Sequence, residues 1–327
     1  MPDPVISVRN LVVEIPTRHA VLKPVDGVSF DIQTGEILGV VGESGAGKSM
    51  TGNAVIGLLD PPARISGGEI YLKGRRIDNL GREAMRRLRG KEIGMVFQDP
   101  LTSLNPLLRI GDQLTETMLA HLDISETEAR KRAIASLEEV GIPAAASRID
   151  AYPHEFSGGM RQRVVIALAL CAEPALVIAD EPTTALDVSV QAQIIALLKR
   201  LCRDRGTAVM LVTHDMGVIA EAADRVAVMY AGRLAELGPV REVVQRPRHP
   251  YTEGLMASTP LASQGQERLR QIPGAMPRLG NLPAGCAFHP RCPRAQGQCR
   301  AEPWPTLEAD QDRAACWFPV EHLEVAE

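Results

Sequence analysis

The residues that most restrict what this chain can fold into are 42–49, which read GESGAGKS. They match the pattern G-x-x-x-x-G-K-[ST] and lie between a short apolar run, EILGVV, and a helical stretch, KSMTGNAVIGLL. Glycines allow backbone N–H groups to turn inward around a phosphate chain, and the N-terminus of the following helix carries about half a positive charge. The sequence therefore predicts an α/β fold in which a buried strand, a phosphate-binding loop (the P-loop, residues 42–49) and a helix follow one another.

The side chains of the P-loop predict its ligand. Lys48 is placed to reach the β- and γ-phosphates of a nucleotide, and the Ser49 hydroxyl is placed to bind Mg²⁺. A chance glycine-rich turn before a helix is the alternative, and the combination of strand, loop, Lys-Ser pair and helix disfavours it. The residues expected to contact the nucleotide here are Gly42, Ser44, Gly45, Ala46, Gly47, Lys48, Ser49 and Met50.

Two further apolar runs lead into polar residues. ALVIAD ends at Asp180, which Glu181 follows, and AVMLVT precedes His214. The carboxyl ends of parallel strands share one edge of a sheet, where ligands of α/β proteins bind. We expect Asp180 to hold Mg²⁺, directly or through water, and Glu181 to act as general base toward an attacking water. An isolated Asp-Glu pair would more simply be a surface turn or a helix cap, and an isolated His an ordinary polar residue at a strand end.

The stretch FSGGMRQR, residues 156–163, resembles the signature sequence of ABC-type ATPases. Six motifs occur in the order of that family: GESGAGKS, MVFQDP, FSGGM, ALVIADE, TALD and VTHD. The resemblance implies a P-loop NTPase of the ABC cassette type, with a RecA-like parallel sheet core, an antiparallel N-terminal β subdomain and an inserted helical subdomain. We expect the cassette to span residues 1–240. Its helical subdomain is expected at about 99–165, where SETEARKRAIASLEEVGI has helical periodicity and a Ser-x-x-Glu start.

The same resemblance implies roles for single residues outside the P-loop. Gln98 would sense the γ-phosphate and Mg²⁺, and His214 would contact the γ-phosphate. Asp187 would communicate across a dimer of two cassettes. The catalytic residues are therefore expected to be Glu181, His214 and Gln98, and the Mg²⁺ ligands to be Ser49, Gln98 and Asp180. The ATP of the opposite cassette would be contacted by Ser157, Gly158 and Gly159.

This sequence departs from the usual family pattern at three places. Phe156 and Met160 replace the more common Leu and Gln of the signature, and both changes spare the small residues that let backbone approach a phosphate. The segment VEIPTRHAVLKPVDG before the P-loop lacks Tyr, Phe and Trp, so the aromatic platform for adenine is missing. His19 is the nearest ring and is the expected adenine contact.

Residues 241–327, the C-terminal extension, carry the features that separate members of this family. RHPYTEGLM, IPGAMP and GCAFHPRCPRAQGQC resemble the C-terminal extension of dipeptide and oligopeptide importer ATPases. The resemblance implies an ATP-hydrolysing subunit that works with a second related ATPase, two transmembrane permease subunits and an extracytoplasmic peptide-binding protein. An importer of another small solute, such as a nickel complex or an opine, is an alternative that the sequence leaves open.

Four of the six cysteines lie in this extension, at Cys286, Cys292, Cys299 and Cys316. In a reducing cytosol such a group favours a metal site over disulfides, and four thiolates suit both tetrahedral Zn²⁺ and an iron-sulfur cluster. The importer resemblance favours a 4Fe-4S cluster, with Zn²⁺ or free thiols as alternatives. A metal would stabilise a Pro-rich tail that we expect to be poor in apolar residues. Cys171 and Cys202 are expected in the cassette core.

Composition and length exclude other classes of protein. The net charge of -4 provides no basic field for a nucleic-acid backbone. A soluble ABC ATPase acting on nucleic acid would need heptad arms or a second cassette, and the compact interval from Lys48 to Asp180 has neither. The start MPDPVISVRN lacks a signal-peptide pattern, and the longest apolar run, VVIALALCA, is shorter than the roughly 18 residues that suggest a membrane helix. We expect a peripheral protein at the cytoplasmic face of the membrane.

Overall fold

The computed structural model describes residues 3–184, 186–259, 271–307 and 313–322. Within these ranges the chain forms two compact units. Unit 1 comprises residues up to 33, residues 37–79 and the chain from 212 onward, and unit 2 comprises residues 34–36 and 80–211. The predicted domain boundary at residue 240 stays a prediction.

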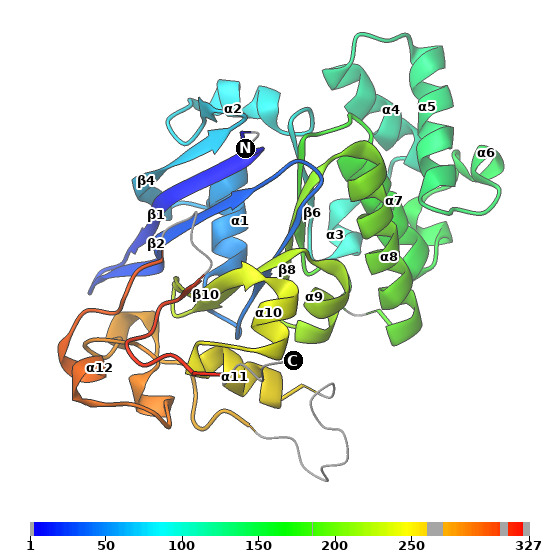
Figure 1. Ribbon diagram of the computed structural model, residues 1–327. Coiled ribbons are helices and arrows are strands. Elements are labelled where there is room, and N and C mark those ends of the chain that lie inside the picture. The colour runs from blue at the N-terminus through cyan, green and yellow to red at the C-terminus, as the bar shows by residue number, and fades with distance from the viewer. Residues whose placement is uncertain (1–2, 185, 260–270, 308–312, 323–327) are drawn as a thin grey trace. The chain divides into compact units, whose positions relative to one another are not determined.

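Unit 1 contains an antiparallel sheet with the strand order β2-β1-β4-β5. Its strands are β1 (Ile6–Pro16), β2 (Val21–Ile32), β4 (Arg64–Leu72) and β5 (Arg75–Arg76). In β1 the apolar side chains of Val8, Leu11 and Val13 are fully buried. Helix α1 (Lys48–Ile56) packs on β1, β2 and β4 (Figure 1). These elements confirm the antiparallel N-terminal β subdomain that the sequence predicted.

A second group of strands in unit 1 carries the P-loop. Strand β3 (Ile37–Val41) pairs in parallel with β9 (Arg225–Tyr230), and β9 pairs antiparallel with β10 (Arg233–Pro239). The short β11 (Arg313–Ala314) pairs with β10. All of β3 is buried, as expected for an apolar run without alternation. The helices of this part are α9 (Met216–Ala222) and α10 (Val240–Gln245).

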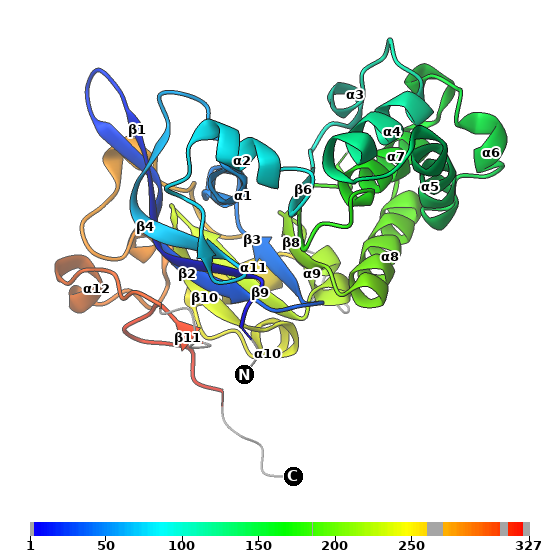
Figure 2. The same ribbon diagram turned by 90° about the horizontal axis from the view of Figure 1, so that it is seen from above.

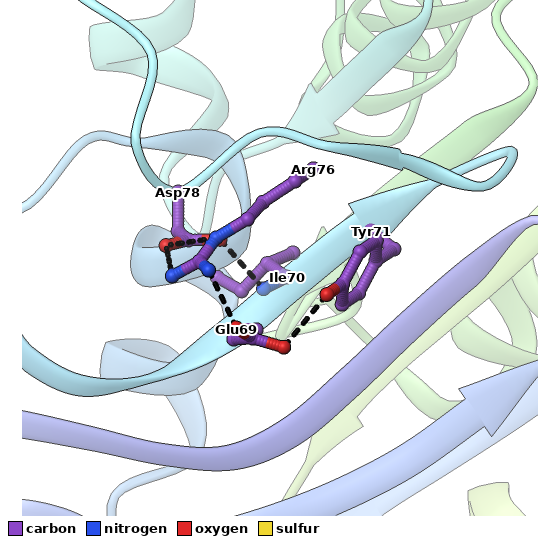
Figure 3. Close-up of polar contacts among 5 residues, drawn as sticks. All are labelled: Glu69, Ile70, Tyr71, Arg76 and Asp78. Atoms are coloured by element: carbon purple, nitrogen blue, oxygen red, sulfur yellow. Dashed lines mark hydrogen bonds and ion pairs between the residues drawn. The ribbon is translucent and has the colours of Figure 1, made fainter.

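A polar cluster lies on β4, on β5 and in the segment that directly follows β5 (Figure 3). Arg76 donates to both carboxylate oxygens of Asp78 and to Glu69, and the Tyr71 hydroxyl donates to Glu69 at 2.6 Å. The Ile70 N–H donates to Asp78 at 2.9 Å. Burial alone would raise the pKa of Asp78, but these hydrogen bonds outweigh burial and hold the pKa below its usual value. A charged Asp78 therefore ties the segment after β5 to β4.

Replacing Asp78 with Asn should lower the free energy of unfolding by about 1–2 kcal/mol at pH 7, because it removes charged hydrogen bonds from a side chain that is 6% exposed. A carboxylate whose pKa is lowered in the folded state contributes fully above its usual pKa, near 3.8, and loses this contribution as the pH falls further. Urea denaturation should therefore show a smaller difference between wild type and variant at pH 3 than at pH 7. Asp123→Asn, at an exposed site, is the control. An equal difference at both pH values would contradict the role of the charge.

The C-terminal extension shares an aromatic core with β9. Its helical segments are α11 (Pro250–Ala257), η3 (Leu279–Asn281), η4 (His289–Arg291) and α12 (Gly297–Ala301). The buried rings of Tyr251, Phe288 and Trp304 surround Tyr230, with centroids 4.6, 5.3 and 6.2 Å from the Tyr230 ring. The prediction of a tail poor in apolar residues did not include this aromatic core. The large side chains are scattered singly along the sequence, so no periodic pattern reveals them.

Unit 2 contains two parallel strands and a group of helices. Strand β6 (Ile93–Val96) pairs in parallel with the fully buried β7 (Leu176–Asp180), and β8 (Ala208–Thr213) is divided between the two units. The helices are α2 (Arg82–Leu88), α3 (Pro100–Ser103), α4 (Ile110–His121), α5 (Glu126–Glu139), α6 (Ala145–Arg148), η1 (Pro153–Glu155), α7 (Gly158–Leu170) and α8 (Val188–Arg205). Figure 2 shows α4, α5 and α7 close together, as expected for the predicted inserted helical subdomain.

Local signals set the limits of the unit 2 helices. Ser125 caps α5 by accepting from the Glu128 N–H at 3.2 Å, as the Ser-x-x-Glu pattern predicted. Gly206, with φ +65°, ends α8 in the left-handed conformation that favours glycine. Cys171 and Cys202 are buried, which confirms their place in the core. Among the helices of the described ranges, none has both the length and the apolar character that a bilayer crossing requires.

Candidate nucleotide-binding site

The P-loop connects the buried strand β3 to helix α1 in unit 1, as predicted. Gly47 precedes the helix with φ +106°, a backbone conformation that favours glycine. A Cβ atom at this position would lie 2.2 Å from the Pro24 carbonyl oxygen. The close approach of two backbone segments therefore requires the glycine of the G-K-S sequence.

Lys48 is held inside the turn of the P-loop. Lys48 is 6% exposed, and its Nζ donates to the carbonyl oxygens of Gly42 at 2.8 Å and Glu43 at 3.1 Å. The buried Thr51 hydroxyl donates to the Gly47 carbonyl at 3.0 Å and fixes the first turn of α1. Ser49 is exposed. A fixed ammonium group and a helix N-terminus at one loop form an anion-binding arrangement.

The two histidines predicted to contact nucleotide lie in different settings of unit 1. His214 is exposed and directly follows β8. The next residue, Asp215, caps α9 by accepting from the Gly217 N–H at 2.7 Å, which fixes the turn that carries His214. His19 is exposed in the turn between β1 and β2, where its backbone N–H donates to the Thr17 hydroxyl at 3.4 Å. Its predicted adenine contact stays a prediction.

Unit 2 brings the predicted catalytic carboxylate and the predicted γ-phosphate sensor together. Asp180 is the buried last residue of β7, and Glu181 follows it. The Gln98 amide donates to Glu181 Oε2 at 3.1 Å, and the Thr184 hydroxyl donates to the same oxygen at 2.8 Å. Two donors on one carboxylate oxygen fix the orientation of the Glu181 side chain, which a general base requires.

The backbone at Glu181 is strained. Its φ of +47° lies in the left-handed region, which non-glycine residues rarely adopt. Such conformations cost about 1–3 kcal/mol and concentrate at functional sites. The turn that produces this conformation is closed by the Thr184 N–H, which donates to the Glu181 carbonyl at 3.1 Å. The strained residue directly follows β7, and strain at this position supports a functional role for Glu181.

The signature sequence forms the start of α7 in unit 2. Phe156 is buried, and Ser157 caps the helix, its hydroxyl accepting from the Met160 N–H at 3.4 Å. A Cβ atom at Gly159 would lie 2.8 Å from a methyl group of Val190, so this position has no room for a side chain. Gly158 has open space around its Cα. The Ser-Gly-Gly sequence thus presents backbone at a helix N-terminus, as predicted for an anion-binding loop.

Asp187, which was predicted to act across a dimer, has a local role in the structure. It caps α8 by accepting from the Val190 N–H at 2.9 Å, and the Ser189 hydroxyl donates to it at 2.7 Å. The hydrogen bond from the Val190 N–H lowers the pKa of the Asp187 carboxyl group. Within the TALD motif, Ala185 lies outside the described residues. Contact of Asp187 with a second cassette stays a prediction.

The four cysteines of the extension line one pocket, together with His249, Phe288 and Trp317. Burial raises the pKa of Cys286 to about 12, and burial, with a smaller contribution from the Cys299 thiol, raises the pKa of Cys292. In the part of the chain that the structure describes, no group of three or more His, Cys, Asp and Glu side chains is arranged to hold a metal ion. The donor chemistry fits a soft metal, whereas the arrangement of the side chains does not support the predicted metal site.

Sequence reasoning missed several residues that contact the predicted site. Thr184 supports Glu181, and only its place three residues later in the same turn could have suggested it. Tyr251 and Arg291 contact Glu43, the second residue of the P-loop. They are separated from it by 208 and 248 residues, so no local pattern predicts these contacts.

The fold resembles solved ATP-binding cassettes. The dimeric post-hydrolysis structure of the cassette MJ0796 bound to ADP and Pi matches with a TM-score of 0.65 at 28% identity, covering 72% of this chain and 99% of that chain. The cbiO1 subunit of the cbiONQ transporter from Clostridium perfringens matches with a TM-score of 0.65 at 29% identity, covering 75% and 92%. A family profile described as "ABC transporter" matches residues 25–184. The P-loop, the carboxylates at the end of β7 and the capped Ser-Gly-Gly helix define an ABC cassette.

The curated relatives narrow this class. The dipeptide transport ATP-binding protein DppD of Bacillus subtilis (strain 168) is 47% identical over 326 residues, 99% of this chain and 97% of that protein. The oligopeptide transport ATP-binding protein OppD of Escherichia coli (strain K12) is 47% identical over 98% of this chain and 95% of its own length. A profile described as "Oligopeptide/dipeptide transporter, C-terminal region" matches residues 235–299. The chain belongs to the dipeptide and oligopeptide transport ATP-binding proteins of the ABC family.

Proposed function

We propose that this chain is the ATP-hydrolysing subunit of an ABC importer of dipeptides or oligopeptides. The observation that carries the proposal is the carboxylate of Glu181, the predicted general base, which Gln98 and Thr184 fix at the end of β7 in a chain that also has a complete P-loop. The C-terminal extension supports the peptide branch of the family, since its profile is named for oligopeptide and dipeptide transporters.

The site residues divide into three roles in this proposal. The P-loop residues bind the phosphates of ATP, with Lys48 at the β- and γ-phosphates and Ser49, Gln98 and Asp180 holding Mg²⁺. Bound Mg²⁺ would neutralise the developing charge on the phosphates. Glu181 accepts the proton of the attacking water, while His214 and Gln98 contact the γ-phosphate and the metal.

A second cassette completes the proposed site. Ser157, Gly158 and Gly159 present a capped helix N-terminus, which binds anions. We propose that this loop binds the ATP held by a related partner ATPase and that Asp187 contacts that partner. Two permease subunits and an extracytoplasmic peptide-binding protein complete the complex, and they place this chain at the cytoplasmic face of the membrane.

Reconstitution of the full complex in lipid vesicles tests the cargo. Vesicles that contain this chain, its partner ATPase, the permeases and the binding protein should accumulate a radiolabelled dipeptide or oligopeptide only when MgATP is supplied on the side of the cassettes. A nickel complex and an opine serve as competing cargoes in the same vesicles. ATP-dependent accumulation of either of these, without accumulation of peptides, would contradict the peptide proposal and leave the transport ATPase in place.

We propose further that Cys286, Cys292, Cys299 and Cys316 bind a metal, either a 4Fe-4S cluster or Zn²⁺. Their soft thiol ligands support this proposal. The bound group would cross-link segments of the extension that lie far apart in the sequence, and would so stabilise its fold.

Metal analysis of the anaerobically purified chain tests this second proposal. About four iron and four acid-labile sulfide per chain would indicate the cluster, and about one zinc would indicate the alternative. We expect Cys292→Ser to lower the metal content and Cys202→Ser, in the cassette core, to leave it unchanged. A chain that contains neither metal would exclude the site and leave the ATPase proposal intact.

A further inference from the structure

Glu43, inside the P-loop, is held by the C-terminal extension at two separate points. Its carboxylate accepts from Arg291 Nη1 at 3.0 Å to Oε1 and 3.1 Å to Oε2. Its backbone N–H donates to the hydroxyl of Tyr251 at 2.9 Å. All three residues belong to unit 1. The extension therefore contacts both the backbone and the side chain of a P-loop residue.

Arg291 is fixed by its surroundings, unlike an arginine in an ordinary surface ion pair. Its side chain is only 7% exposed. Nε donates to the Pro273 carbonyl at 2.8 Å, and Nη1 also donates to the Tyr230 hydroxyl at 3.3 Å. The guanidinium lies 5.8 Å from the Tyr230 ring centroid and 6.0 Å from that of Phe288. Because the guanidinium is already ordered by these contacts, pairing with Glu43 costs little side-chain entropy.

Tyr251 and Met276 extend the contact along the loop. Tyr251 is fully buried on α11, and its ring packs 4.6 Å from that of Tyr230, so the hydroxyl position is fixed. The methyl group of Met276 lies 3.2 Å from the place of a Cβ atom on Gly45. Glu43 and Gly45 lie in the first half of the P-loop, and both meet residues of the extension.

The charge of Glu43 gives this contact a consequence for ligand binding. A carboxylate in an anion-binding loop repels phosphate, and the Arg291 guanidinium neutralises that charge. The Glu43 carbonyl oxygen also accepts from Lys48 Nζ at 3.1 Å, so a displaced Glu43 would move a partner of the P-loop lysine. Arg291 thus acts on the phosphate site through Glu43 and needs no contact with the nucleotide.

We infer that Arg291 and Tyr251 are positioning residues of the nucleotide site, by which the C-terminal extension holds the P-loop in the shape and charge state that bind the phosphates of ATP. This inference rests on the proposed nucleotide site. The extension then has a role in nucleotide binding, besides the similarity that places the chain in the peptide branch.

The decisive experiment measures MgATP affinity of the full-length chain by isothermal titration calorimetry. Arg291→Met keeps the length of the side chain and removes its charge, and it should weaken MgATP binding about 10-fold because Glu43 is left uncompensated. Arg300→Met, an exposed arginine of the same extension, is the matched control and should bind like wild type. Unchanged affinity of a folded Arg291→Met chain would overturn the inference.

A double-mutant cycle separates charge compensation from general damage to the fold. Glu43→Gln removes the repelling charge, so adding Arg291→Met to it should weaken binding by less than about 3-fold. An additive cycle, with the full 10-fold loss also in the Glu43→Gln background, would overturn the inference. In the assembled transporter, Arg291→Met should raise the KM for ATP and leave kcat within about 3-fold of wild type, since Arg291 touches no reacting atom.

Hydrogen exchange supplies a readout in the opposite direction. If the extension strengthens nucleotide binding, thermodynamic linkage requires that the bound nucleotide also stabilises the extension. MgATP should therefore slow amide exchange in residues 285–300 of wild type, and this protection should be lost in Arg291→Met. Exchange in this segment that MgATP does not affect would overturn the inference. Lys48→Ala distinguishes the two proposals. The inference alone fails if Lys48→Ala abolishes binding and Arg291→Met binds MgATP like wild type. A wild-type chain without MgATP binding refutes the nucleotide site itself.

Discussion

Glu181→Gln is expected to lower kcat for ATP hydrolysis by about 10²- to 10⁴-fold in the assembled transporter, while MgATP still binds. The amide keeps the size of the side chain and an oxygen that can accept from Gln98 and Thr184, whose donors lie 3.1 and 2.8 Å from Oε2. It cannot accept the proton of the attacking water. Phosphate release under saturating MgATP measures the loss, and calorimetry on the same variant measures the retained binding.

Glu138→Gln is the control for this change, because Glu138 is an exposed glutamate on α5 of the same unit. It should hydrolyse ATP like wild type. Wild-type turnover in Glu181→Gln would show that another group is the base. A variant that also lost MgATP binding would show that the carboxylate acts in the ground state and not in the transition state.

The second large effect is expected from Gly47→Ala, which should weaken MgATP binding at least about 100-fold, or about 2.7 kcal/mol. A Cβ atom at residue 47 would lie 2.2 Å from the Pro24 carbonyl oxygen, and the backbone φ of +106° is itself strained for alanine. The loop must therefore open, which moves the start of α1 and Lys48 together. Titration of the full-length variant with MgATP measures the loss.

Gly74→Ala is a matched control for backbone strain. Gly74 also has a positive φ, +75°, and a Cβ atom there meets nothing within 4 Å. We expect it to cost about 1 kcal/mol of stability, through its conformation alone, and to leave MgATP binding unchanged. Equal affinities for Gly47→Ala and wild type would contradict the close approach of the P-loop to Pro24.

The elements around the site could be predicted because their signals are local. The short buried strands β3 and β7 are apolar runs, and the helices α1 and α7 begin within glycine-containing motifs. Even the cap of α5 follows from residues three positions apart. The order of these motifs sufficed for the fold class, since each motif contains its own strand or helix boundary.

The contacts of the extension could not be predicted, because they depend on tertiary packing. Arg291 lies in a Pro- and Cys-rich segment without periodicity and reaches Glu43 across 248 residues. The buried rings of Tyr251, Phe288 and Trp304 occur singly, so their common core appears only in the folded chain. The cysteine spacing predicted a metal site. Arg291, which contacts Glu43 of the P-loop, directly precedes Cys292, and no sequence pattern indicated its role.

The strained turn at Glu181 belongs to the same group of features. Its sequence, Asp-Glu-Pro after an apolar strand, predicted a carboxylate at a sheet edge. The positive φ of Glu181 and its hydrogen bonds from Gln98 and Thr184 could be identified only in the three-dimensional structure. Chemistry could thus be assigned from residue type and order, whereas the orientation of the side chains could not.

The most direct test of this account is a titration of the full-length chain with MgATP, compared with Lys48→Ala. We expect saturable binding at about one site per chain for wild type, and its loss in Lys48→Ala, because the ammonium that Gly42 and Glu43 hold in the P-loop is then absent. Absence of saturable binding in wild type, or equal binding in both proteins, would contradict the assignment of residues 42–49 as the nucleotide site and with it the proposed ATPase.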